Sequence, residues 1–141
     1  MNKIFTVLIG FVLSTSAWAG WVYGNMKVSR FKYIYDGDTF YVDIDEWPRI
    51  IGKNMPVRVK GIDAPEIDGK CDKEVFLARK ATARLEKILL NAKTIELRRI
   101  ERGKYFRILA EVYVDGQNVA DLMLKSGFVR PYRGGKRKPW C

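Results

Sequence analysis

The chain has 141 residues, a formal net charge of +10 at pH 7 and no histidine. Without histidine, catalytic Ser-His and Cys-His pairs and histidine-bound zinc are excluded, and the two cysteines are too few for a thiolate zinc site. The strong positive charge favours a polyanionic partner, namely nucleic acid, an anionic membrane surface or an acidic polysaccharide.

The first residues have the pattern of a secretory signal. Lys3 gives a short basic start, residues 4–13 are apolar, and residues 17–19 read Ala-Trp-Ala, the small-x-small pattern that precedes a cleavage site. The apolar run is well short of the roughly 18 residues of a membrane-spanning helix, which makes an uncleaved anchor the weaker alternative. We therefore expect residues 1–19 to be a signal peptide and the protein to be exported, either periplasmic or secreted, without stable membrane association after signal removal.

The rest of the chain has the length of one small domain. No repeat, low-complexity tract or Pro/Gly/Ser-rich linker divides it. We expect residues 20–27 to be an N-terminal extension and residues 28–141 to form a single domain that acts as a monomer.

The first part of this domain has the alternation of β-strands. Polar and apolar residues alternate on both sides of Asp36-Gly37, which predicts a β-hairpin with its turn at these two residues. Residues 45–55 contain Pro48 and Gly52 and are expected to form a longer hairpin connection. Residues 56–60 alternate again and predict a third strand.

The second part has a helix between strands. Apolar residues at helical spacing predict a helix over residues 73–92, and residues 94–100 and 107–114 predict two further strands. Asn118 is a suitable N-cap for a short helix that ends at Gly127. Five strands with a helix between the third and the fourth, followed by a short C-terminal helix, predict an α+β fold built on a small Greek-key barrel of the OB type. Such barrels commonly bind oligonucleotides or oligosaccharides.

Three acidic residues are candidates for a metal site. Asp38 follows the tight turn, and Asp63 and Glu66 lie where another strand ends, so strand pairing in one barrel can bring all three to one rim. Ala64 precedes a proline and therefore has an extended backbone whose carbonyl is a further possible ligand. Oxygen ligands without nitrogen or sulfur suit a hard cation such as Ca²⁺ or Mg²⁺.

Two arginines are candidates for phosphate binding. Arg58 lies on the strand that leads to the acids, and Arg107 begins a strand that can neighbour it. Two guanidinium groups beside one metal can stabilise the charge that develops on a phosphodiester during hydrolysis. Since the chain has no histidine, a glutamate such as Glu66 is the candidate for activating the attacking water.

The two cysteines, Cys71 and Cys141, are expected to form a disulfide because the chain is expected to be exported. Each of the other features has an ordinary structural interpretation as well. Asp38 can be part of a simple hairpin turn, Asp63 and Glu66 can be solvated loop charges, and the basic C-terminal tail can be solvated surface. Only their combination favours a catalytic site.

Three segments identify a family resemblance. "DGDTFYVDI", "VRVKGIDAPE" and "GKYFRILAEVYVDGQNVADLMLKSGFVRPY" resemble, in order and spacing, staphylococcal (micrococcal) nuclease and its exported thermonuclease-like relatives. The resemblance implies an OB-type barrel and Ca²⁺-dependent hydrolysis of DNA and RNA that leaves 3′-phosphates. It also implies that calcium is bound by Asp38, Asp63 and the backbone carbonyl of Ala64, where the family's type member has threonine.

The resemblance assigns roles to further residues. It implies that Glu66 activates water, that Arg58 and Arg107 bind the phosphate, and that Lys104 and Tyr105 lie near the terminal phosphate of the nucleotide. We expect single-stranded or locally opened substrates to be preferred, because a shallow site must reach the backbone. The alternative is a catalytically inactive OB-type domain that binds nucleic acid or an acidic glycan.

Overall fold

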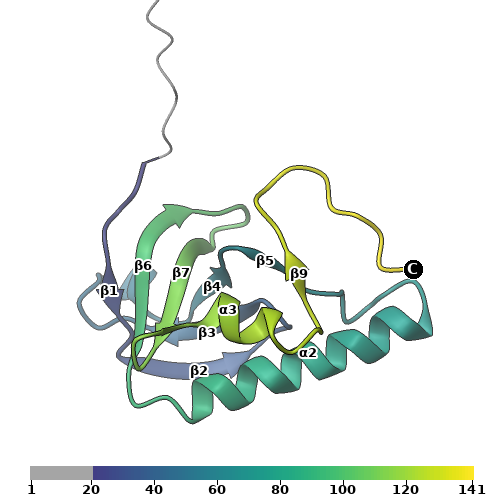
Figure 1. The fold of residues 1–141 in the computed structure, drawn as a ribbon. Coiled ribbons are helices and arrows are strands. Elements are labelled where there is room, and N and C mark those ends of the chain that lie inside the picture. The colour runs from purple at the N-terminus through teal and green to yellow at the C-terminus, as the bar shows by residue number, and fades with distance from the viewer. Residues whose placement is uncertain (1–20) are drawn as a thin grey trace, which may run out of the picture.

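The structure is a computed structural model that describes residues 21–141 (Figure 1). The predicted signal peptide lies outside these residues. Seven strands form one curled mixed sheet: β1 (Met26–Lys27), β2 (Arg30–Ile34), β3 (Thr39–Asp43), β4 (Met55–Val59), β6 (Ile95–Arg102), β7 (Ile108–Val114) and β8 (Gln117–Asn118). A second, two-stranded sheet pairs β5 (Ile62–Asp63) with β9 (Arg130–Pro131). The helices are α1 (Arg49–Gly52), α2 (Asp72–Leu90) and α3 (Val119–Leu124).

The order of strands in the large sheet is β1-β6-β7-β4-β3-β2, with β8 attached to β7. The pairs β2–β3, β3–β4 and β6–β7 are antiparallel, whereas β4 and β7 are parallel. Parallel pairing requires a long crossover, and this chain provides it through α2 and β6. A curled mixed sheet with a helix between its third and fourth long strands is the predicted OB-type α+β arrangement.

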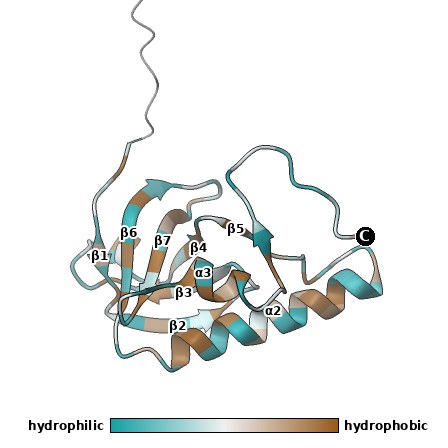
Figure 2. Ribbon diagram, viewed as in Figure 1, coloured by the Kyte–Doolittle hydropathy of each residue, from teal (hydrophilic) through white to brown (hydrophobic). Residues whose placement is uncertain are grey.

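The core lies between the curled sheet and the helices. Phe40, Val42 and Ile44 on and beside β3 are fully buried, as their alternation predicted. Helix α2 buries one stripe of small and aliphatic residues and leaves its charged side exposed (Figure 2). The residues of this stripe are Ala78, Ala81, Leu85 and Leu89.

Some elements differ from the expectation. The connection expected over residues 45–55 contains the single helical turn α1. Met26 and Lys27, which were assigned to an N-terminal extension, pair with β6 in the large sheet. Helix α3 begins after its predicted cap Asn118, but it ends at Leu124, three residues before Gly127, because the chain there leaves the helix through a left-handed Gly127 with φ +75°.

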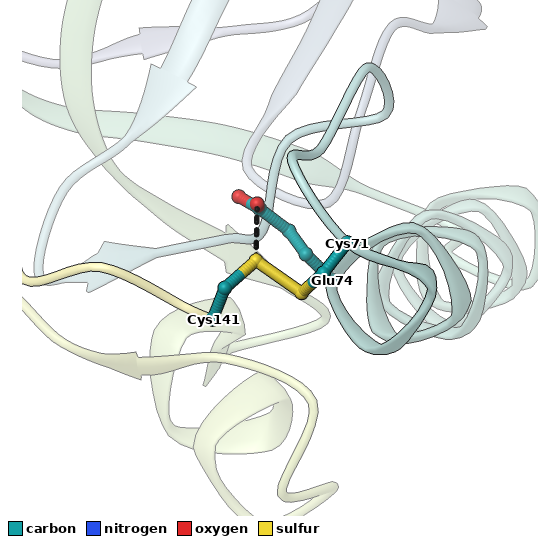
Figure 3. Close-up of side chains that lie close together, drawn as sticks. All are labelled: Cys71, Glu74 and Cys141. Carbon is teal, nitrogen blue, oxygen red and sulfur yellow. Dashed lines mark hydrogen bonds between the residues drawn. A yellow bond between two sulfur atoms is a disulfide. The ribbon is translucent and has the colours of Figure 1, made fainter.

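A disulfide ties the C-terminus to the start of α2 and closes a loop with a sequence separation of 70 residues. The bonded residues are Cys71 and Cys141, the predicted pair (Figure 3). Glu74 lies beside the bridge, with an oxygen 3.5 Å from the Cys141 sulfur. Because the two sulfurs are bonded to each other, neither cysteine is a thiolate that could bind a metal beside Glu74.

No helix in residues 21–141 is long and apolar enough to cross a membrane.

Candidate functional site

The site is built where the β2–β3 hairpin turn meets the end of β5. Gly37 in this turn packs so closely that an added Cβ would lie 2.5 Å from the Cβ of Ala81 and 2.9 Å from that of Ala64. A side chain at this position would force the turn away from α2. The glycine therefore allows Asp38, the next residue, to lie against the segment that carries Asp63 and Ala64.

Asp38 is buried and fully engaged by neighbours from three segments. Its Oδ1 accepts a hydrogen bond from Thr39 Oγ1 at 2.8 Å, and its Oδ2 accepts one from the backbone N–H of Ala64 at 3.0 Å. Arg58 Nη1 on β4 lies 2.8 Å from the same Oδ2. These three contacts fix the orientation of the Asp38 carboxylate.

Asp63 is completely buried, at 0% exposure, and faces three guanidinium groups. Arg130 donates to Oδ2 through Nε at 3.0 Å and Nη2 at 2.8 Å. Arg137 Nε lies 3.1 Å and Arg58 Nη2 3.7 Å from Oδ1. Oδ1 nevertheless accepts no hydrogen bond, because the Arg137 N–H is not directed at it and Arg58 Nη2 is too distant. A buried carboxylate oxygen thus keeps its lone pairs free for another partner.

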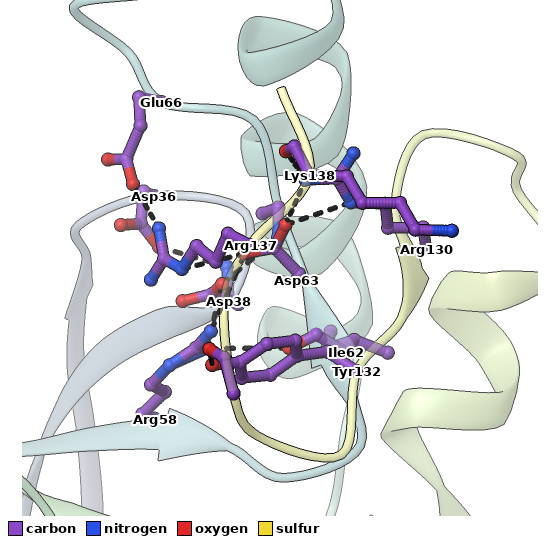
Figure 4. A network of polar contacts seen from close by, with 12 residues as sticks. Asp36, Asp38, Arg58, Ile62, Asp63, Glu66, Arg130, Tyr132, Arg137 and Lys138 are labelled. Atoms are coloured by element: carbon purple, nitrogen blue, oxygen red, sulfur yellow. Dashed lines mark hydrogen bonds and ion pairs between the residues drawn. The ribbon is translucent and has the colours of Figure 1, made fainter. Parts of the chain in front are cut away.

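Glu66 lies at the exposed edge of the cluster (Figure 4). Its carboxylate forms an ion pair with Arg137 Nη1, and its backbone N–H donates to Glu74 at 3.3 Å. An exposed carboxylate beside two buried ones is accessible to water, as a general base must be.

Asp36 is a fourth carboxylate of this cluster. Its Oδ1 accepts a hydrogen bond from the backbone N–H of Asp38 at 2.9 Å, which closes the turn. Burial, and next the negative charge of Asp38, raise the pKa of Asp36 to about 6. The raised pKa of Asp36 thus reflects mainly its burial and, second, the nearby charge of Asp38.

Arg58 and Arg107 are brought to one groove of about 1430 Å³ beside the acids. Parallel pairing of β4 with β7 places Arg58 opposite Leu109, two residues after Arg107. Arg58 also contacts both aspartates, whereas Arg107 makes no ion pair with a described residue, and its Nε is buried without a hydrogen-bond partner. One arginine is therefore held by the acids and the other is free to bind an anion from the groove.

Lys104 and Tyr105 lie at the tip of the β6–β7 hairpin and line the same groove. Tyr105 and the following Phe106 are exposed and have left-handed backbones, with φ of +56° and +58°. The tip thus presents an aromatic ring and a cation to the groove at some cost in backbone strain.

The sequence analysis missed three residues of the cluster: Asp36, Arg130 and Arg137. Asp36 had been interpreted only as a turn former. The two arginines belong to a tail whose charges were interpreted as solvated surface. The signal that could have found them is Cys141, because a disulfide to Cys71 requires the tail to return past the "GIDAPE" segment.

The donor set fits a hard cation. Asp38 and Asp63 present carboxylate oxygens from adjacent segments, and Oδ1 of Asp63 is buried without a hydrogen bond. Residues that could hold the ion are these two aspartates together with the Ala64 carbonyl, since oxygen-only ligands match Ca²⁺ or Mg²⁺ better than a transition metal.

Comparison with protein families gives a match over much of the chain. The family model described as staphylococcal nuclease homologue matches residues 56–139, more than half of the chain. This segment contains Arg58, Asp63, Glu66 and Arg107, and Asp38 lies before it. A search of curated proteins found no match.

Proposed function

Because the chain belongs to the staphylococcal nuclease homologue family, we propose that it is an exported, Ca²⁺-dependent nuclease that cleaves DNA and RNA and leaves 3′-phosphate ends. The observation that carries the proposal is the contact of one arginine, Arg58, with two buried aspartates, at 2.8 Å from Asp38 and 3.7 Å from Asp63. A domain that only binds polyanions would lose affinity by keeping such acids beside its groove.

In the proposed mechanism Asp38, Asp63 and the carbonyl of Ala64 would hold Ca²⁺, which would supply positive charge to stabilise the phosphate during hydrolysis. Glu66 accepts a proton from the attacking water, whose oxygen forms the new bond to phosphorus. The bond between phosphorus and the 5′-oxygen breaks, the 5′-oxygen takes a proton from solvent and leaves as a hydroxyl, and the phosphate stays on the 3′-oxygen.

Arg58 and Arg107 are proposed to bind the phosphoryl oxygens. Their planar guanidinium groups can donate two parallel hydrogen bonds and keep their charge at any working pH. Stabilisation of charge that develops in the transition state lowers the barrier more than binding of the ground state does. Lys104 and Tyr105 are proposed to bind the neighbouring nucleotide.

The substrate is proposed to be any accessible nucleic acid strand. The groove offers cations and an exposed tyrosine, which bind phosphate and stack on bases without reading sequence. Single-stranded or locally opened regions should be cleaved fastest, and the protein is proposed to work as a monomer after export.

The test uses the purified chain from residue 20 onward with denatured DNA and with RNA. Each substrate is incubated with Ca²⁺, with Mg²⁺ and with excess chelator, and the ends of the products are analysed. Cleavage of both substrates that requires Ca²⁺ and leaves 3′-phosphates is the expected result. Tight binding without cleavage under every condition would instead assign the chain to the non-catalytic binding domains.

A further inference from the structure

The C-terminal tail places a cation of its own among the acidic residues. Arg137 lies between Asp63, whose Oδ1 is 3.1 Å from its Nε, and Glu66, which pairs with its Nη1. Figure 4 shows its side chain among the carboxylates of the cluster. Burial lowers the pKa of Arg137, but the charges of Asp63, Glu66 and Asp38 outweigh this and raise it above the ordinary arginine value.

The part of the tail that follows Arg137 is held in position by several contacts. Arg130 Nη1 donates to the carbonyl of Pro139 at 3.2 Å, and its Nη2 donates to the carbonyl of Lys138. The Arg130 guanidinium also lies 4.1 Å from the ring centre of Trp140. Cys141 then bonds to Cys71. The contact of Arg137 with the acids is therefore part of a fixed tail conformation.

Protein groups already occupy the acids that would hold the cation. Arg58, Arg130 and Arg137 pair with Asp38, Asp63 and Glu66, and Asp36 is a fourth carboxylate that has no ion pair with a described residue. The three guanidinium groups repel an entering cation, and Arg137 Nε lies 3.1 Å from Oδ1 of Asp63, the oxygen that has no hydrogen bond. Departure of one arginine would therefore favour tight binding of the cation.

Arg137 is the arginine best able to leave. The side chain of Arg58 is 8% exposed and that of Arg130 24%, whereas that of Arg137 is 39% exposed. Arg58 would be left buried without its acidic partners, at high cost, and Arg130 is also tied to the carbonyls of Lys138 and Pro139. Arg137 can turn into solvent or into the groove that it lines.

We propose that Arg137 competes with the divalent cation for Asp63, so that the disulfide-tethered tail sets the cation concentration at which the site fills. The inference rests on the proposed function, in which Asp38 and Asp63 bind the cation. Reduction of the disulfide should weaken the competition. It releases Cys141, which anchors the tail four residues after Arg137.

The experiment measures cation affinity without substrate. Ca²⁺ is titrated calorimetrically into the wild-type chain, Arg137→Gln and Lys136→Gln, each oxidised and reduced, and far-UV circular dichroism verifies folding. Lys136→Gln is the matched control, because it removes the same charge from the adjacent exposed residue of the tail. Two partly exposed ion pairs predict that Arg137→Gln binds about three- to tenfold more tightly than Lys136→Gln.

Reduction should strengthen Ca²⁺ binding to the wild-type chain and leave Arg137→Gln unchanged. Equal affinity of Arg137→Gln and Lys136→Gln would overturn this inference alone and leave the proposed cation site intact. Absence of Ca²⁺ binding in every variant, with all variants folded, would overturn the cation site and with it the proposed function. If reduction unfolds the chain, the oxidised pair of variants still decides the inference.

Discussion

Asp43 and Asp63 are both buried carboxylates that face three cationic side chains. Asp43 also accepts the backbone N–H of Asn54 at 3.0 Å, and its cations reach it from the exposed surface. Both share a cation with a second carboxylate, but Asp45, which shares Lys53 with Asp43, is exposed, whereas Asp38, which shares Arg58 with Asp63, is buried. A buried ion pair alone therefore does not mark a functional site, and the feature particular to Asp63 is a second buried carboxylate beside it.

The role of Glu66 can be separated from metal binding. We expect Glu66→Gln to lower turnover by about 10²- to 10⁴-fold, the usual contribution of a general base. Its affinity for Ca²⁺ should change little, because Glu66 is exposed at the edge of the cluster. Calorimetric titration with Ca²⁺ and single-turnover cleavage of one oligonucleotide measure the two effects. Loss of Ca²⁺ binding in this variant would identify Glu66 as a direct ligand.

The role of the two-pronged guanidinium group of Arg58 can be tested by a substitution that keeps the positive charge. Lysine has one ammonium group and cannot contact Asp38 and Asp63 together as the guanidinium does at 2.8 and 3.7 Å. We expect Arg58→Lys to lose several orders of magnitude in turnover. The control is Arg99→Lys, because Arg99 is exposed and pairs only with Glu111. Unchanged turnover in Arg58→Lys would argue against phosphate binding by this residue.

At the scale of single residues, the sequence predicts those site residues that lie on or beside strands. Arg58 and Asp63 follow from alternation and from the place where a strand ends, and the structure brings both to Asp38. Arg130 and Arg137 could not be predicted in the same way. Polar and apolar residues do not alternate regularly in their segment. Long-range contacts, such as the stacking of Arg130 on Trp140, leave no local sequence pattern in a chain rich in basic residues.

At the scale of elements, long periodic segments are predictable and short ones are not. Helix α2 spans Asp72–Leu90, close to the expected residues 73–92. Helix α1 has four residues, too few to show a helical period, and the two-residue strands β5 and β9 are defined only by each other. The β5–β9 pair sets Asp63 opposite Arg130. Asp63 was predicted as a site residue, but the two short strands that position it could not be predicted from the sequence.

The turn between β7 and β8 gives a pH-dependent prediction. Asp115 accepts backbone hydrogen bonds from Thr94 at 2.8 Å and from Lys93 at 3.1 Å, and these bonds lower the pKa of Asp115 below its usual 3.8. Its stabilising effect is therefore present above pH about 4 and is lost as the pH falls through the lowered pKa.

The matched variant is Asp115→Asn, because asparagine tolerates the left-handed backbone of this position, φ +48°. We expect the wild-type chain to melt at a higher temperature than the variant at pH 6, with the difference shrinking below pH about 4. Thermal melts across this range measure it. A difference independent of pH would show that the charge of Asp115 does not contribute.

At the scale of the whole molecule, the net positive charge favours an anionic partner, whereas the acidic cluster favours a cation. The net charge of +10 favours a polyanionic partner, and in the proposed function the groove lined by Arg107 and Lys104 leads such a partner to the acidic cluster. The tail completes this arrangement because it returns from β9 across the rim to the start of α2 (Figure 1).

The disulfide should therefore stabilise the whole fold as well as the tail. Joining residues with a sequence separation of 70 restricts the unfolded chain strongly, and such bridges typically contribute about 2–4 kcal/mol. For a domain of this size the corresponding change in melting temperature is roughly 10 °C. We expect reductant to lower the melting temperature of the wild-type chain by about this amount, as measured by circular dichroism. The double variant Cys71→Ser/Cys141→Ser should melt at the lower temperature with or without reductant, and equal melting of the oxidised and reduced wild-type chain would mean that the sheet and α2 alone determine stability.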